Sequence, residues 1–245
     1  MTIPNRQSTG KPRPFVFVQL APYLGPTRVN PSTGVEDNVA FVRAAQMKAL
    51  ALPGVAMASA IDWGDIHSPY GDIHPRWKSP VGERLALAVG ALTYGDSSST
   101  SAASSIPMGT SGPFVLNATV VAAVSTSTAY DVRVTFDQSV TLMPPIATTP
   151  PIAGLLPAAA QHGCQPAEIG RGDQNCATFI VNGKKVAKAS VGMDTKGGNA
   201  SVLLKVGAAT PPKRVSYLHA NFPVAVVWAQ AGAQLPAAPF EIECR

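Results

Sequence analysis

Short apolar runs alternate with stretches of helical period over the first 95 residues of the chain. The runs at 14–24 (PFVFVQLAPYL) and 55–62 (VAMASAID) have the length and apolar content of buried strands. A helical pattern follows the first run, and a polar loop and a second helical pattern follow the second. The order strand, helix, strand, loop, helix predicts an α/β layer built on a parallel sheet.

The first helical pattern predicts a helix over residues 36–52, ended by Pro53 and Gly54. Glu36 and Asp37 fall in its first turn, where the positive end of the helix dipole favours acids. Its apolar face is predicted from residues at helical spacing, namely Val42, Ala45, Ala49 and Leu52.

The second helical pattern predicts a helix that begins at the N-cap residue Ser79 and ends at Gly95. Pro80 stands in the first turn, where proline is tolerated. The predicted apolar face consists of Val81, Leu85, Ala88 and Leu92.

The pattern changes beyond residue 95. Residues 96–106 read as a serine-rich linker, and residues 107–245 carry strand-like runs separated by turns. The Asn-Gly pair in VNGKKV is a hairpin signal, and the proline- and alanine-rich residues 142–163 predict a surface loop. We therefore expect an α/β part at 1–95, a linker, and an antiparallel β domain of sandwich-like architecture.

The composition narrows the function classes that the chain can have. Apolar residues make up 46% of the 245 residues and charged residues 13%, which is typical of a globular protein. The net charge of +5 is not gathered into a basic run with aromatics, so no nucleic-acid partner is expected. No apolar segment of a signal peptide is seen, and no apolar stretch reaches the roughly 20 residues that span a membrane.

The cysteines do not form a zinc motif, because Cys164, Cys176 and Cys244 include no CxxC pair. Two alternatives stay open for Cys164 and Cys176, which flank a polar loop: a disulfide in an oxidising compartment, or reduced buried thiols. We expect neither a metal ion nor an organic cofactor.

Gly95, Asp96 and Ser97 match the Gly-Asp-Ser nucleophile signature of serine esterases. A nucleophile of that type follows a strand at the start of its α/β domain. Ser97 instead follows a predicted helix and opens the serine-rich linker. We therefore interpret Ser97 as a polar residue beyond a helix C-terminus.

Candidate chemistry is concentrated in the loop at 62–78, after the second predicted strand, where α/β proteins usually build active sites. A histidine becomes an effective general base when a carboxylate holds its other ring nitrogen. The loop contains acids and histidines at five positions, Asp62, Asp65, His67, Asp72 and His74. His74 can pair with Asp72, or with Asp65 or Asp62 if either folds back onto it. The alternative is a solvated acidic loop with incidental histidines; a metal site is less expected, since the loop lacks a helical His-x3-His frame.

Several segments in succession resemble the sialate O-acetylesterase family, carbohydrate esterases of the SGNH/GDSL hydrolase superfamily. They are FVFVQLAPY, VRAAQ, GVAMASAIDWGD and GDIHPRWKSPVGERLALAVGALTYG, followed by SGPFV, VTFDQ and NFPVAVVWAQAGAQLPAAPF. The resemblance covers nearly the whole chain apart from the proline- and alanine-rich loop. It implies the C-terminal part of an SGNH-type α/β/α hydrolase domain followed by the β domain.

The resemblance also implies a chemistry. The family's catalytic histidine belongs to the IHP element, which places that role on His74. The usual Asp-x-x-His pattern is not kept, because Gly71 stands three residues before His74, so the supporting acid is Asp72, Asp65 or Asp62. The expected reaction is hydrolysis of an O-acetyl ester on a glycan or sialic acid by a serine, a histidine and an aspartate.

The family's nucleophile serine and oxyanion donors lie in blocks upstream of FVFVQLA. We therefore expect this chain to supply the histidine and the acid without the serine, and to hydrolyse acetyl esters weakly or not at all by itself. By resemblance the compartment is secreted or lysosomal.

A second hypothesis is a non-catalytic carbohydrate-binding protein derived from such an esterase. Aromatic side chains provide stacking faces for sugars, and the candidates are Trp63, Tyr70, Trp77 and Trp228. Aromatic residues are more often part of a core, and Trp228 in VAVVWA is most simply a strand residue.

Overall fold

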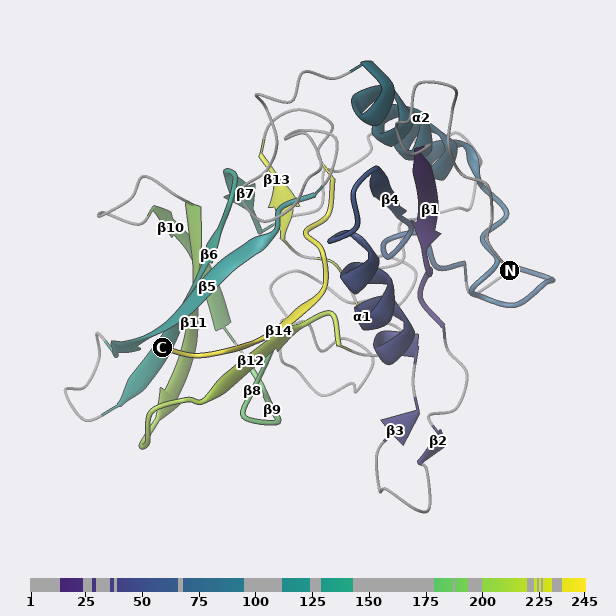
Figure 1. Ribbon diagram of the computed structural model, residues 1–245. Helices are drawn as coiled ribbons and strands as arrows, with labels where there is room; N and C mark the ends of the chain where they lie inside the picture. The colour runs from purple at the N-terminus through teal and green to yellow at the C-terminus, as the bar shows by residue number, and fades with distance from the viewer. Residues whose placement is uncertain are drawn as a thin grey trace.

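The structure is a computed structural model. It describes residues 14–23, 28–29, 36–37, 39–65, 68–94, 112–123, 129–142, 179–186, 188–193, 200–219, 223, 225, 227–230 and 235–245. Two helices and a short parallel strand pair lie on one side, and antiparallel sheets lie on the other (Figure 1). None of the helices in these residues is long and apolar enough to cross a membrane. The predicted boundaries at 95 and 106 fall in 95–111, outside the described residues, and stay predictions.

The predicted parallel pair is present. Strand β1 (Phe15–Gln19) pairs in parallel with β4 (Val55–Ser59), with Phe15 opposite Val55 and Gln19 opposite Ser59. Helix α2 (Ser79–Tyr94) packs on both strands. A small apolar core joins the pair to both helices and to the start of the β domain, and it contains Leu50, Val55, Ala56, Met57, Ala88, Phe114 and Ala238.

Helix α2 follows the prediction closely. It begins at Ser79, and Val81 and Ala88 are buried at helical spacing as expected. Arg84 is buried on the same face. Leu92 packs against the core from the last turn.

Helix α1 (Val39–Ala49) is shorter than predicted, and the prediction of helix for residues 36–37 was wrong. Glu36 and Asp37 form strand β3 (Glu36–Asp37), which pairs antiparallel with β2 (Arg28–Val29). The backbone of these acids therefore belongs to a strand pair, and the helix has no acid in its first turn.

The predicted apolar face of α1 was wrong at Val42, Ala45 and Leu52, whereas Ala49 packs against the small core as expected. Val42 and Leu52 are exposed, whereas Ala40 and Arg43 are buried. Arg43 donates to the carbonyl oxygens of Leu20 (2.8 Å from Nε) and Ala21 (2.6 Å from Nη2). These bonds turn the Arg43 side of the helix toward the end of β1, and burial lowers the pKa of Arg43 to about 9.

Gln46 adds a second polar anchor between α1 and β1. Its Nε2 donates to the carbonyl of Val18 (3.0 Å), and its Oε1 accepts from the amide of Leu20 (3.1 Å). The side-chain amide thus satisfies backbone groups on the edge of β1 that faces away from β4.

The other strands of the described chain pair in antiparallel sheets, as predicted. One sheet has the order β10-β11-β6-β5 and a second has the order β14-β12-β8-β9. Their bounds are β5 (Val115–Ala122), β6 (Tyr130–Phe136), β8 (Phe179–Val181), β9 (Lys184–Lys185), β10 (Lys188–Met193), β11 (Ala200–Ala208), β12 (Arg214–Tyr217) and β14 (Phe240–Glu243). A two-stranded pair joins β7 (Val140–Thr141) to β13 (Trp228–Ala229).

The two larger sheets share one core. Buried side chains from both contribute to it, including Phe136, Val202, Phe179 and Tyr217. The rings of Phe179 and Tyr217 lie 4.7 Å apart between centroids. Trp228 is buried in the same cluster, and its Nε1 donates to the carbonyl of Ala225 (3.1 Å), so it offers no surface face to a sugar.

The Asn-Gly hairpin between β8 and β9 is confirmed. Asn182 has φ 48° and Gly183 has φ 75°, the left-handed conformation that a tight hairpin turn requires at both positions. The Asn182 Oδ1 also accepts from the amides of Lys213 (2.9 Å) and Arg214 (3.1 Å), which ties the turn to β12.

Gly112 occupies a close approach between two backbones. A Cβ at this position would lie 1.6 Å from the carbonyl oxygen of Pro236. We expect Gly112→Ala to lower the free energy of unfolding by about 1–3 kcal/mol, because the backbones must separate. Gly90→Ala is the matched control: a Cβ there meets nothing within 4 Å inside α2, so that change should stabilise by about 0.5–1 kcal/mol. Urea unfolding of both variants checks this, and equal effects would contradict it.

Candidate active-site loop

The acid- and histidine-rich loop begins where β4 ends, at the carboxyl end of the parallel pair. It lies on the side of the pair away from the antiparallel sheets (Figure 1). The amide of Asp65 donates to the carbonyl of Asp72 (3.0 Å), and the amide of His74 donates to that of Gly71 (2.9 Å). Gly71 has φ 92°, which favours glycine. The loop is therefore folded back on itself by its own backbone.

Asp65 is a buried anchor within the loop, with 1% of its surface exposed. It binds Arg76 through three contacts: Oδ2 accepts from the backbone amide (3.2 Å) and from Nε (2.7 Å), and Oδ1 accepts from Nη2 (3.1 Å). The hydrogen bond to Asp65 raises the pKa of Arg76. These bonds hold the segment before His74 to the segment after it.

Asp62 anchors the loop to helix α2. Its carboxylate pairs with Arg84 in a two-pronged geometry, with Oδ1 2.6 Å from Nη1 and Oδ2 2.7 Å from Nη2. Both side chains are buried, and Arg84 Nη1 also donates to the carbonyl of Ser59 (2.7 Å). The start of the loop, the end of β4 and the first half of α2 are thereby fixed together.

His74 is exposed at the surface of this anchored loop. Its backbone carbonyl accepts from the hydroxyl of Ser68 (2.6 Å). Within the described part of the chain, the His74 ring makes no hydrogen bond or ion pair. A carboxylate that orients this ring therefore stays a prediction, because two of the three candidate acids bind arginines instead.

Aromatic side chains flank the loop. Trp63 and Trp77 pack edge to face, with ring centroids 4.8 Å apart and an interplanar angle of 83°. Tyr70 is 77% exposed at the turn before Gly71. Each of these side chains remains at least partly accessible in the structure.

A hydrogen-bonded polar pair lies where the two strands end. Gln19 is fully buried, and its Oε1 accepts from the hydroxyl of Ser59 (3.1 Å). The amide of Ile61 donates to the same hydroxyl (3.3 Å), which fixes the first residues of the loop.

Sequence reasoning missed both arginines that shape the loop. Arg84 carried a usable signal, since it stands at helical spacing between Val81 and Ala88, on the apolar face of α2. A charge on an apolar face implies a buried partner. Arg76 carried no such signal, because its partner depends on how the loop folds.

Other candidates from the sequence lie outside the described residues, namely His67, Ser97, Cys164 and Cys176. Cys244 is a free, partly buried cysteine, and burial raises the pKa of its thiol. Among the described residues, no group of three or more histidines, cysteines and acids is placed to hold a metal ion.

Comparison with curated proteins finds sialate O-acetylesterases. The chain is 37% identical to the enzyme from Rattus norvegicus over 90 residues, which is 36% of this chain and 16% of that protein. It is 47% identical to the enzyme from Homo sapiens over 49 residues, 20% of this chain and 9% of that protein. No family model matches the chain.

Comparison with solved structures finds a carbohydrate acetylesterase from Xanthomonas citri, with a TM-score of 0.57 and 22% identity. The match covers 94% of this chain and 40% of that one. The shared fold is mixed α/β with several antiparallel sheets. Together with the sialate O-acetylesterase matches, it confirms the resemblance expected from the sequence.

Proposed function

Starting from the resemblance to sialate O-acetylesterases, we propose that this chain forms the acid–base part of a carbohydrate O-acetylesterase. His74 is the general base, and the nucleophile is a serine that is not among these 245 residues. The observation that carries the proposal is the loop itself: two aspartate–arginine pairs anchor it at the carboxyl end of β4, and it leaves the His74 ring exposed.

The reaction follows from these roles. The serine hydroxyl attacks the acetyl carbonyl while His74 takes its proton, and the bond to the sugar oxygen then breaks. His74 delivers the proton to that oxygen, which releases the sugar hydroxyl and leaves an acetyl-serine. Water activated by His74 hydrolyses this intermediate, which releases acetate and restores the serine.

Anchoring of the loop supports this role. A general base works best when its position is fixed before the substrate arrives, since each ångström of misplacement costs rate. Asp65 holds the chain on both sides of His74, and Asp62 ties the loop to α2. We assign Asp62 and Asp65 to positioning, and Asp72 to orienting the imidazole, because Asp72 stands only two residues before His74.

The substrate class in this proposal is an O-acetylated glycan or sialic acid. The carbohydrate esterases found by comparison support it. Trp77 and Tyr70, both accessible beside the His74 segment, provide apolar faces of the kind that pack against sugar rings.

The experiment requires a source of the nucleophile. We define the completed enzyme as this chain joined to the part of the Xanthomonas citri acetylesterase that it does not match. Acetate release from O-acetylated sialic acid and from an O-acetylated polysaccharide is then measured for the completed enzyme and for the 245-residue chain.

We expect the chain by itself to release acetate at or near the uncatalysed rate, because His74 lacks its serine. The completed enzyme should turn over at least one of the two substrates. Efficient turnover by the chain alone that is lost in the His74→Ala variant would contradict the expectation that the nucleophile is missing. Turnover that persists in His74→Ala would contradict the role of His74, since another group would then carry the reaction.

A further inference from the structure

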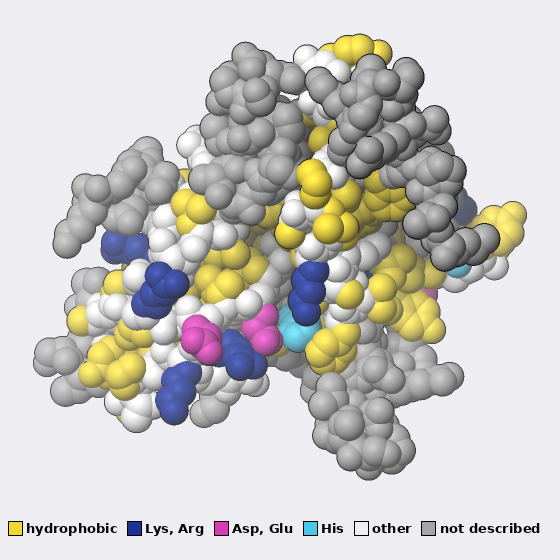
Figure 2. Space-filling view, in the orientation of Figure 1, with side chains coloured by type: hydrophobic (Ala, Val, Ile, Leu, Met, Phe, Trp, Pro, Cys, Tyr) yellow, Lys and Arg dark blue, Asp and Glu magenta, His cyan; other side chains and the backbone are white. Residues whose placement is uncertain are grey.

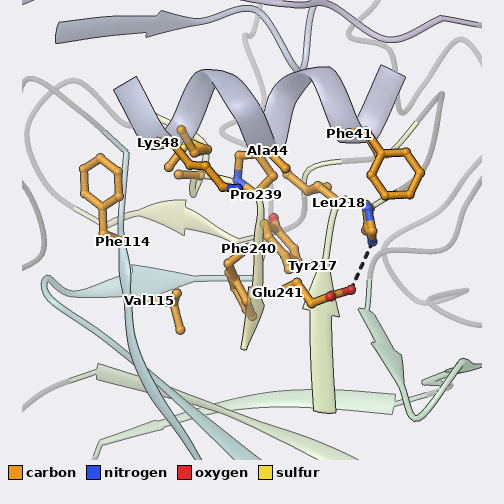
Figure 3. Close-up of a pocket in the computed structure, with 14 residues that line it drawn as sticks. Phe41, Ala44, Lys48, Phe114, Val115, Tyr217, Leu218, Pro239, Phe240 and Glu241 are labelled. Carbon is orange, nitrogen blue, oxygen red and sulfur yellow. Dashed lines mark ion pairs between the residues drawn. The ribbon is translucent and has the colours of Figure 1, made fainter. Parts of the chain in front are cut away.

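A pocket lies between helix α1 and the β domain. Its volume is about 450 Å³, and its walls come from α1, from the residues that lead into β5, and from β12 and β14 (Figure 3). It shares no residue with the loop at 62–78. In Figure 2, hydrophobic side chains are seen in the hollow between α1 and the sheets, with charged side chains beside them.

The α1 wall is a continuous face of the helix, formed by Ala40, Phe41, Ala44, Met47 and Lys48. These positions recur at the spacing of neighbours on one side of a helix. Ala40 and Ala44 are small, so the centre of the wall is recessed. Phe41 and Lys48 are seven residues apart, about 10 Å along the axis, and they lie toward opposite ends of the pocket (Figure 3).

The opposite wall is apolar and aromatic. Tyr217, Phe240 and Leu218 lie across from the helix (Figure 3). The Tyr217 hydroxyl already accepts from the amide of Val227 (2.9 Å), so we expect its contribution to a ligand to come mainly from the ring. The rings of Tyr217 and Phe240 stack 5.5 Å apart between centroids, which gives this wall a fixed shape.

The acidic and basic side chains that line the pocket differ in whether they have ion-pair partners. Glu241 is shared between Arg214 (3.1 Å) and His219 (3.4 Å), and the Phe41 ring packs edge-on against the His219 ring with centroids 5.4 Å apart. The Glu241 carboxylate at that end of the pocket therefore already has two partners. Lys48, at the other end, is exposed and makes no ion pair with any residue that the structure describes.

We propose that this pocket binds a small amphipathic carboxylate. The apolar body of the ligand lies between α1 and the Tyr217–Phe240 wall, and its carboxylate meets Lys48. The volume falls within the range of about 300–1,000 Å³ that small-molecule sites occupy, and a position between two parts of a chain is common for such sites. The proposal does not depend on the esterase assignment.

Phenylhexanoate is the probe, because its length is close to the separation of about 10 Å between positions 41 and 48 along the helix axis. Titration of the 245-residue chain, followed by ligand-observed NMR, is expected to give a dissociation constant of about 1 mM or lower. Phenylhexylamine, which has the same apolar body with the opposite charge, should bind at least about fivefold more weakly. No binding of phenylhexanoate, or equal binding of the two probes, overturns the proposal.

Substitutions in α1 test whether the probe binds in this pocket. Ala44→Trp fills the recess and should abolish binding, whereas Ala45→Trp places the same side chain on the adjacent exposed position outside the pocket and should not change it. Lys48→Met should weaken phenylhexanoate binding about fivefold and leave phenylhexylamine unchanged or tighter. Binding that survives Ala44→Trp, or is lost equally in Ala45→Trp, overturns the assignment to this pocket.

Discussion

Replacing His74 with alanine is expected to lower acetate release by the completed enzyme by about 10²–10⁴-fold, the usual contribution of a positioned general base. The loss should fall mainly on kcat, because the role proposed for the imidazole is to move a proton in the transition state, with little part in holding the substrate. Acetate release measured over a range of substrate concentrations separates kcat from KM.

His67→Ala is the matched control, since it removes an imidazole from the same loop while the IHP element stays intact. We expect its activity to remain within a fewfold of the unmodified enzyme. Equal losses of acetate release in the two variants would show that any substitution in the loop impairs the enzyme. A His74→Ala variant that keeps its activity would show that His74 is not the general base.

Breaking the buried pair between Asp62 and Arg84 is expected to have the largest effect on stability. Arg84→Met leaves the Asp62 carboxylate buried without its partner, and such a loss typically costs about 3–5 kcal/mol. The same change removes the bond from Arg84 to the Ser59 carbonyl. Urea unfolding should therefore show a strongly lowered midpoint for the α/β part.

Two comparisons make this prediction specific. Arg214→Met breaks the exposed pair with Glu241 and should cost no more than about 1 kcal/mol. The double variant Asp62→Leu with Arg84→Met removes both charges and should be more stable than Arg84→Met alone. Equal costs for Arg84→Met and Arg214→Met would contradict the role of the buried pair.

The parts of the fold that could be predicted are those in which residues close together in the sequence decide the structure. β1, β4 and α2 follow their hydrophobic patterns, and the Asn-Gly turn follows from the need for positive φ at Asn182 and Gly183. Local sequence contains enough information for such elements.

The orientation of α1 could not be predicted in the same way. Its apolar residues favoured Val42 as a core position, but Arg43 and Gln46 bind backbone groups at the end of β1 and turn the opposite side inward. Those acceptors lie more than twenty residues away in the chain. A periodicity calculated from hydrophobicity alone gives no weight to such bonds.

The candidate site was partly predictable for a similar reason. The position of Asp62, Asp65, Asp72 and His74 in one loop at the end of β4 follows from the order of elements. The partners of the acids do not, because Arg84 comes from α2 and Arg76 from the far side of the turn. That Asp72 is the acid that orients His74 therefore stays a prediction. Acetate release by the Asp72→Asn and Asp65→Asn variants of the completed enzyme shows which of the two acids His74 depends on.

The most direct test of His74 is the labelling of the nucleophile by a fluorophosphonate, which reacts with a serine only when a neighbouring base activates it. Intact and peptide mass spectra of the completed enzyme should show one modified serine outside the 245 residues of this chain, and the His74→Ala variant should show none. Labelling that is undiminished in His74→Ala, or that occurs at Ser97 of this chain by itself, would contradict the account.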